Sequence, residues 1–279
     1  MNRKNVLITG CSSGIGQALA EEYLRQGYRV YATARNIANL AHLTDEQLFP
    51  LAMDVNNSDD IAAAIKIITE EDGHLNCLIN NAGYAAMGPM AELSQELLQQ
   101  QFATNVFAPL ALTQATVPLL RAAATEERPA QVVNIGSVSG ILTTPFSGAY
   151  CATKAALHSI SDALRMELAP FGIHVVTVQP GAIQSKFGDN SLANLIKGLK
   201  KDSLYLPLKN QMEARATASQ DNPTPAEEFA RELIAQLLSK PDDVIRIGHG
   251  SRILPLIARW LPTSLSDRIL SKKFGLNRL

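Results

Sequence analysis

The amino-acid sequence predicts an α/β fold in which a doubly wound, mostly seven-stranded parallel sheet has helices on both faces. Short β-branched runs alternate with longer amphipathic segments from about residue 5 to about residue 247, and this alternation is typical of parallel strands joined by crossover helices. The short runs are apolar nearly throughout, as expected for strands covered on both faces. A length of 279 residues favours a single domain over residues 1–279.

The expected elements follow one another along the chain as this fold requires. Strands are expected at residues 6–9, 29–33, 48–53, 78–80, 131–135, 174–179 and 244–247. Amphipathic helical segments between them include residues 14–26, 58–71, 95–120 and 149–169. A later helix is expected to begin at Thr224-Pro225, because Glu227 completes a capping box and proline favours the first helical position.

Two segments depart from the alternating pattern. Residues 182–222 are mixed and polar, and an insertion near the carboxyl ends of the strands is expected to form a substrate loop or lid. Residues 252–279 form an amphipathic C-terminal extension with Trp260 and several basic side chains. Three interpretations of this extension stay open: a dimer or lid element, a peripheral membrane contact, and an intramolecular cap.

Composition excludes several classes of protein. The chain is 46% hydrophobic and 18% charged with a net charge of −1, so no nucleic-acid partner is expected. Cys11, Cys77 and Cys151 have neither metal-ligand nor CxxC spacing, which favours a reducing compartment and no metal site. The first apolar run is too short for a signal peptide, and no stretch approaches the roughly 20 apolar residues of a membrane span. A cytoplasmic protein is expected.

A glycine-rich loop follows the first expected strand and opens the first helix. Its spacing is G-x-x-x-G-x-G, and a strand–turn–helix context of this kind brings backbone N–H groups at a helix N-terminus towards a pyrophosphate. The residues expected to bind a dinucleotide there are Gly10, Ser12, Ser13, Gly14, Ile15 and Gly16.

The end of the second expected strand favours NADP(H) over NAD(H). The carboxylate that binds ribose hydroxyls in NAD-binding folds is missing there, and Arg35 stands one place beyond the strand. A guanidinium binds a 2′-phosphate through charge-assisted hydrogen bonds, and Ser12 can add a hydroxyl. Asp54 is placed to accept from the adenine amino group. A merely solvated Arg35 and a turn carboxylate at Asp54 are the alternatives.

Tyr150 and Lys154 are four residues apart in an expected helix, so the phenol and the ammonium share one face. Free tyrosine has a pKa near 10, so acid/base work near neutral pH needs a decrease of roughly three units, about 4 kcal/mol. We expect Lys154 to provide it through Coulomb attraction, with further help from the positive charge of the oxidised nicotinamide. Ser137 ends the fifth expected strand, where its hydroxyl can donate to a substrate oxygen.

Taken together, these residues strongly resemble the short-chain dehydrogenase/reductase family. The matching elements are the loop at residues 9–16, Asp54, Asn80-Asn81-Ala82-Gly83, Asn105, Ser137, Tyr150 with Lys154, and Pro180-Gly181. The resemblance implies a Rossmann-type fold and the catalytic set Asn105, Ser137, Tyr150 and Lys154. It also implies that Lys154 holds the nicotinamide ribose and that Asn105 anchors a water in a proton relay.

The resemblance extends the expected dinucleotide site. Further cofactor-binding residues are Val55, Asn81, Ala82, Gly83, Tyr150, Lys154, Pro180, Gly181 and Ile183. The family's usual threonine after Pro180-Gly181 is absent, and Gln184 or Ser185 stands at its place.

The expected substrate is a lipophilic ketone, aldehyde or secondary alcohol, and the expected direction is NADPH-driven reduction. The chain looks most like the branch with 17β-hydroxysteroid-type, retinol-type and acylglycerone-phosphate-type reductases. The residues expected to line an apolar pocket are Ser137, Leu142, Phe146, Tyr150, Phe187, Leu192 and Leu195. The family commonly dimerises through the helices containing Asn105 and Tyr150, so a homo-dimer or tetramer is expected. The rival functions are a same-fold epimerase or dehydratase and a non-catalytic NADP-binding regulator.

Overall fold

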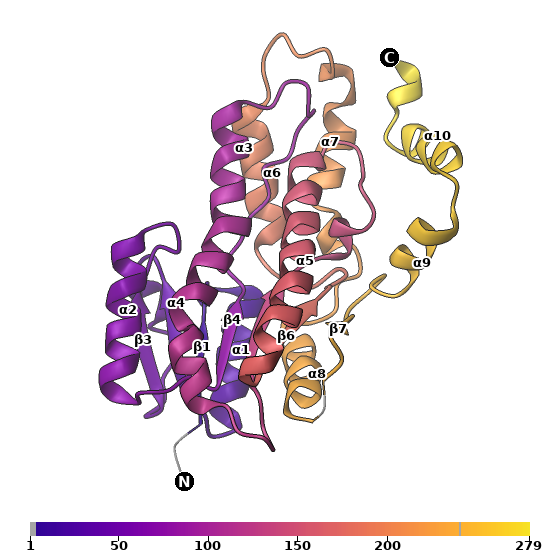
Figure 1. The fold of residues 1–279 in the computed structure, drawn as a ribbon. Helices are drawn as coiled ribbons and strands as arrows, with labels where there is room; N and C mark the ends of the chain where they lie inside the picture. Colours follow the sequence, from indigo (N-terminus) through magenta and orange to yellow (C-terminus); the bar gives the residue numbers. More distant parts are fainter. Residues whose placement is uncertain (1–3, 240) are drawn as a thin grey trace.

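A seven-stranded parallel sheet forms the centre of the molecule in the computed structural model, which describes residues 4–239 and 241–279 (Figure 1). The strand order is β3-β2-β1-β4-β5-β6-β7. The strands are β1 (Asn5–Ile8), β2 (Arg29–Ala34), β3 (Leu48–Ala52), β4 (Cys77–Asn80), β5 (Ala130–Ile135), β6 (Ile173–Val178) and β7 (Val244–Ile245). The predicted doubly wound Rossmann-type fold is therefore confirmed. Residues 1–3 and 240 of the expected domain lie outside the described residues.

Helices cover both faces of the sheet, which explains why the strands are apolar on both sides. On one face, α1 (Gly14–Arg25) packs against α8 (Ala226–Leu238), and buried residues of both helices join one hydrophobic core with β1, β2 and β6. On the other face, α2 (Ser58–Glu71), α4 (Ala108–Ala123) and α5 (Gly148–Leu168) form a second core with β1, β4 and β5. Neither face of the central strands reaches solvent.

The expected helix at residues 95–120 is continuous but changes its winding in the middle. It begins as α3 (Gln95–Phe102), passes through a π-helical turn at Ala103–Phe107 and continues as α4. Contrary to the expectation from sequence, the helix Gln95–Ala123 is long and apolar enough to cross a membrane, judged by length and composition alone. Within its most apolar 18 residues, 44% of the residues are buried inside the protein. The helix packs on β4, β5 and α2 here, as a core helix of the sheet does.

The segment expected to form a lid contains two helices, α6 (Phe187–Gly198) and α7 (Lys209–Ala216). A third hydrophobic cluster joins both of them to the end of the C-terminal extension, which folds as α9 (Ile253–Trp260) and α10 (Thr263–Lys273). In Figure 1 this extension, drawn in yellow, runs along the side of the molecule and ends beside α7. Part of the extension is therefore an intramolecular cap.

The expected capping box at Thr224 is wrong. Helix α8 begins at Ala226 with Pro225 as its N-cap, and no side chain caps it. The backbone of Thr224 instead joins a short ladder with the segment after β6: its N–H donates to the Ala182 carbonyl at 3.0 Å, and its carbonyl accepts from the Gln184 N–H at 2.9 Å. Because the backbone of Thr224 pairs with residues 182 and 184, Thr224 does not cap the helix, and α8 begins two residues later.

Candidate active site

A cleft of about 1730 Å³ opens at the carboxyl ends of the strands. Pockets for one drug-sized ligand are roughly 300–1,000 Å³, so the cleft has room for a dinucleotide and a second molecule. Most residues expected from the sequence line it: Gly10, Ser12, Ser13, Gly14, Ile15, Gly16, Arg35, Asp54, Val55, Asn81, Ala82, Gly83, Ser137, Leu142, Tyr150, Lys154, Pro180, Gly181, Ile183 and Phe187. Asn105 and Phe146 are not among the lining residues.

The glycine loop has the backbone that a dinucleotide-binding turn needs. Gly10 and Gly14 have φ angles of +73° and +60°, in the left-handed region that favours glycine. A Cβ on Gly16 would collide with the carbonyl oxygen of Gly10, so α1 can approach the turn closely only without a side chain there. Ser13 is the N-cap of α1, but its side chain makes no capping hydrogen bond. The first N–H groups of α1 therefore suit an anionic group of a ligand.

Arg35 and Asp54 lie at the expected adenosine end of the cleft. Arg35 is exposed, and its guanidinium makes no ion pair within the described part of the chain. The Asp54 Oδ1 accepts from the backbone N–H of Asn56 at 2.9 Å, so Asp54 is a turn carboxylate while also lining the cleft. An exposed guanidinium without an ion-pair partner among the described residues can bind an anion through charge-assisted hydrogen bonds.

The Asn-Asn-Ala-Gly run after β4 holds neighbouring parts of the site together. Asn80 Nδ2 donates to Asn134 Oδ1 at 2.8 Å, which joins the ends of β4 and β5. Asn81 Nδ2 donates to the carbonyl of Thr9 at 2.8 Å, which joins β4 to the glycine loop. A Cβ on Gly83 would stand 3.1 Å from Asn105 Oδ1. The turn after β4 is therefore in close contact with Asn105, in addition to its hydrogen bonds to β5 and the glycine loop.

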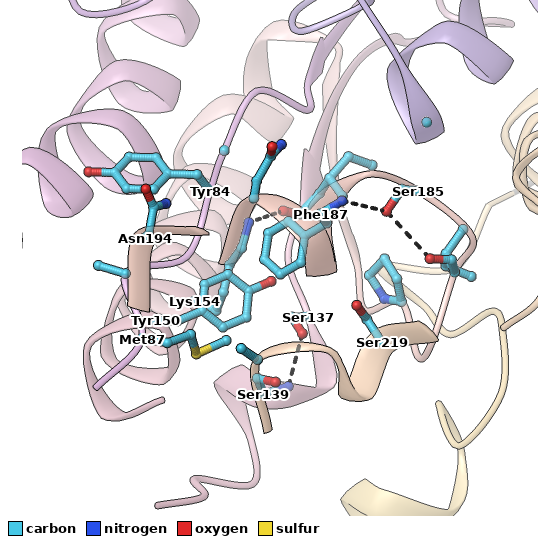
Figure 2. Close-up of a pocket in the computed structure, with 18 of the residues that line it drawn as sticks. Tyr84, Met87, Ser137, Ser139, Tyr150, Lys154, Ser185, Phe187, Asn194 and Ser219 are labelled. Carbon is cyan, nitrogen blue, oxygen red and sulfur yellow. Dashed lines mark hydrogen bonds between the residues drawn. The ribbon is translucent and has the colours of Figure 1, made fainter. Parts of the chain in front are cut away.

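Ser137, Tyr150 and Lys154 meet in the same part of the cleft, although they come from two elements. Ser137 follows β5, and Tyr150 and Lys154 lie one turn apart near the start of α5. Figure 2 shows Tyr150 beside Phe187, with Ser137 to the right of the Tyr150 ring and Lys154 adjacent. Lys154 Nζ donates to the carbonyl of Ile135 at 2.7 Å and lies 5.8 Å from the centroid of the Tyr150 ring.

The expected decrease of the tyrosine pKa is not observed. Burial raises the pKa of Tyr150 to about 12, and the Ser137 hydroxyl and the Arg215 charge only partly offset it. Burial also lowers the pKa of Lys154 to about 8. The reason is that both groups leave water together, and the ammonium bonds to a backbone carbonyl rather than to the phenol. The phenol therefore keeps its proton at neutral pH.

Asn105 lies behind the cleft rather than in its wall. Its Nδ2 donates to the Tyr84 carbonyl at 2.9 Å and to Thr153 Oγ1 at 3.1 Å, and its Oδ1 accepts from the Tyr84 N–H at 3.2 Å. The π-helical turn supplies this position, as extra-wide turns often do next to functional sites. In this structure the Asn105 side chain joins α5 to the chain after β4, and its catalytic role stays a prediction.

The expected substrate residues separate into two groups. Leu142 and Phe187 line the cleft, and the Phe187 ring packs 5.3 Å from that of Tyr150. Phe146 does not line it: its ring is buried against Tyr205 and Phe274, at centroid distances of 6.0 and 6.2 Å. Leu192 and Leu195 likewise belong to the third hydrophobic cluster rather than to the cleft wall. These three residues hold α6, α7 and the C-terminal extension together.

Ser185 makes a local contact at the place of the missing threonine. Its hydroxyl accepts from the Phe187 N–H at 3.3 Å, as Figure 2 shows. A Cβ on Gly14 would stand 2.7 Å from the Cβ of Ser185, so the segment after Pro180-Gly181 lies against the glycine loop. That closeness suits a segment that covers a dinucleotide.

Two residues of the site were missed in the sequence analysis. His158 follows Lys154 by four residues, and its Nε2 accepts from the Ser137 N–H at 3.4 Å. Tyr150, Lys154 and His158 are spaced four residues apart, and this spacing predicts that all three lie on one face of the helix. Burial, with the Lys154 charge next, lowers the pKa of His158 to about 4. Arg215 reaches the cleft from α7, and no motif in its surroundings indicated it.

Comparisons with known proteins agree with this arrangement. The short chain dehydrogenase family matches residues 4–195. The short-chain dehydrogenase ptmH of Penicillium ochrochloron is 33% identical over 99% of this chain and 100% of its own length. The NADPH-dependent 1-acyldihydroxyacetone phosphate reductase of Saccharomyces cerevisiae is 30% identical over 99% of this chain and 93% of its own.

A solved structure of a short-chain dehydrogenase from Streptomyces avermitilis has a TM-score of 0.79 and 27% identity to this chain, covering 99% of this chain and 97% of the other. The family match, the full-length relatives and the strand order lead to one conclusion. This chain belongs to the short-chain dehydrogenase/reductase family of oxidoreductases.

Proposed function

We propose that this protein is an NADP(H)-dependent carbonyl reductase or alcohol dehydrogenase that acts on a lipophilic ketone, aldehyde or secondary alcohol. The convergence of Ser137, Tyr150 and Lys154 in one cleft opposite the glycine loop supports this function most directly. When bound, the nicotinamide supplies or accepts the hydride. A non-catalytic regulator would have no need for a buried phenol, hydroxyl and ammonium in one wall.

The chain's own residues have distinct tasks in this proposal. Tyr150 donates its proton to the carbonyl oxygen as negative charge develops there, and Ser137 donates a hydrogen bond to the same oxygen. Lys154 binds the ribose and favours the ionised phenol once its proton has left. Because burial raises the pKa of Tyr150 to about 12, the phenol carries the proton that the reduction of a carbonyl requires.

Two features support NADP(H) and a lipophilic substrate. The guanidinium of Arg35 lines the cleft and has no carboxylate partner among the described residues, which supports binding of a 2′-phosphate there. The cleft wall next to Tyr150 includes Met87, Leu142 and Phe187, which suit an apolar chain. The yeast relative is itself NADPH-dependent by name and reduces an acylated ketone.

A panel of ketones and aldehydes, followed by the absorbance of reduced nicotinamide, tests the proposal. We expect turnover with long-chain or polycyclic carbonyl compounds and NADPH. Turnover with small polar polyols alone would contradict the proposed substrate class. Release of water from a sugar nucleotide, or inversion of one of its carbons, would instead indicate the epimerase or dehydratase alternative.

A further inference from the structure

Arg215 is held in the wall of the cleft by two hydroxyl groups. Its Nε donates to Thr144 Oγ1 at 2.6 Å, and its Nη2 donates to Ser147 Oγ at 3.0 Å. Those two hydroxyls are 2.8 Å apart, and Ser147 is the N-cap of α5, three residues before Tyr150. The loop before α5 and the lid helix α7 therefore fix the guanidinium close to the proposed acid.

The charge of Arg215 is not neutralised by the protein. Within residues 4–239 and 241–279 it has no carboxylate in ion-pair distance, both of its hydrogen-bond partners are neutral, and Nη1 has no partner. Burial lowers the pKa of its guanidinium. Arg215 is half-buried, and partial withdrawal of a cation from water without a counter-charge is unfavourable, so the site favours a ligand that brings a negative charge.

The cleft wall away from the glycine loop is also basic. Away from the glycine loop, Lys186, Lys197 and Lys273 also line the cleft, and the only carboxylate among the described lining residues there is Asp221. This excess of positive charge contrasts with the net charge of −1 for the whole chain. Apolar side chains also line the cleft away from the glycine loop: Leu142, Phe187, Ile253, Leu254, Leu270 and Phe274. A cationic and apolar wall suits an amphiphile with an anionic group.

We propose that Arg215 binds an anionic group, a carboxylate or a phosphate, on the lipophilic carbonyl substrate. The inference rests on the proposed function and deepens it, since it assigns a substrate class and the residue that selects it. The free Nη1 and the remaining hydrogen of Nη2 can bind two oxygens of such a group side by side. The anion would lie near the reacting carbonyl, because Arg215 lies near Tyr150.

Paired substrates test this assignment. A monoacyl dihydroxyacetone phosphate is compared with the same ketone lacking the phosphate, and a long-chain oxo-acid is compared with its methyl ester. For Arg215→Met we expect the ratio of kcat/KM for the charged over the uncharged member to fall about 10- to 100-fold, mainly through KM. Arg215→Lys should recover part of that ratio. The pair with the larger fall identifies phosphate or carboxylate as the preferred anion.

The matched control is Lys209→Met, which removes an exposed cation from the same helix; among the described residues Lys209 forms an ion pair with Glu213 alone. It should leave both ratios unchanged. If Arg215 served only to support Tyr150 or the loop before α5, Arg215→Met would depress both members of each pair equally and shift the pH profile of kcat. That result would overturn the assignment.

A binding measurement separates this inference from the proposed function. Calorimetry of the protein with dodecanoate, dodecyl phosphate and dodecanol, with and without NADP⁺, needs no turnover. We expect at least one anion to bind more tightly than the alcohol in wild type and to lose that preference in Arg215→Met. No preference for either anion would overturn the assignment, even if ketones are reduced. A preference without any turnover would leave the anion site in place and contradict the oxidoreductase proposal.

Discussion

Tyr150 and Lys154 share one face of α5, yet burial moves their two pKa values apart. The pKa of the phenol rises to about 12, and that of the ammonium falls to about 8. Sequence spacing predicted their proximity correctly, because one helical turn separates them. The spacing could not predict the pKa shifts, because these depend on how far the surrounding residues bury the two side chains and so on whether desolvation outweighs their mutual attraction.

His158 couples the protonation of the site to the stability of the fold. Its pKa is about 4 in the folded protein and about 6.5 when unperturbed. Between these values the unfolded chain binds a proton that the folded chain does not, so the free energy of unfolding should decrease as the pH falls from about 6.5 to about 4. Urea unfolding at several pH values measures this. His158→Gln should flatten the dependence, and His42→Gln, on the surface, is the control. An unchanged pH dependence in His158→Gln would contradict the prediction.

Arg35 is expected to determine the preference between the two dinucleotides. Removing one charge-assisted contact to a phosphate should cost about 1.5–3 kcal/mol, or roughly 10- to 100-fold in the KM for NADPH. Arg35→Ala should therefore lose NADPH selectivity while its KM for NADH changes little. Steady-state kinetics with both dinucleotides measures this. A wild-type preference for NADH would show that the phosphate argument is wrong.

At the scale of elements, local patterns predicted strands and helices well and their packing poorly. The strands and the long helices α1, α2 and α5 lie within a few residues of their predicted bounds. The helix start at Thr224 was missed because its backbone pairs with Ala182. Phe146 was misplaced because its positive φ of 65° turns the chain and sends the ring towards Phe274, which lies 128 positions further along the sequence.

Helix α9 has no buried residue and leaves Ile253, Leu256 and Trp260 exposed. Residues 252–279 contain six basic side chains and one acidic side chain, a combination that suits an anionic lipid surface. We predict that vesicles containing phosphatidylserine sediment this protein, less so at high salt. Trp260→Ser should weaken the association several-fold, whereas Met166→Ser, an exposed apolar residue on α5, should not. If neutral vesicles at high salt sedimented the protein as well as vesicles containing phosphatidylserine, the contribution of the basic side chains to binding would be contradicted.

At the scale of the whole molecule, the doubly wound sheet explains why the candidate site was largely predictable. The carboxyl ends of β1, β2, β4, β5 and β6 meet at one edge of the sheet. Motifs at these strand ends therefore lie close together, independently of the conformation of the connecting loops. The lid wall was less predictable: α7, α10 and the loop before α5 come together only through tertiary packing. Arg215, which depends on that packing, was therefore missed.

Association of whole molecules through α4 and α5 stays a prediction. Phe107, which immediately precedes α4, and Met166 on α5 are exposed by 60% and 67%, and exposed apolar side chains favour burial in an interface. Light scattering should give the mass of a dimer or tetramer, and Met166→Glu should shift it towards the monomer of 30.1 kDa. A wild-type monomer at micromolar concentration would contradict this.

Turnover and NADPH binding by Tyr150→Phe, compared with wild type, test the central claim most directly. The substitution removes one oxygen from a buried ring and leaves Ser137 and Lys154 in place. The account predicts that kcat falls by about 10²-fold or more, as expected for loss of a general acid, while NADPH fluorescence titrations remain near wild type. Turnover within a few-fold of wild type with NADPH bound normally would contradict Tyr150 as the proton donor.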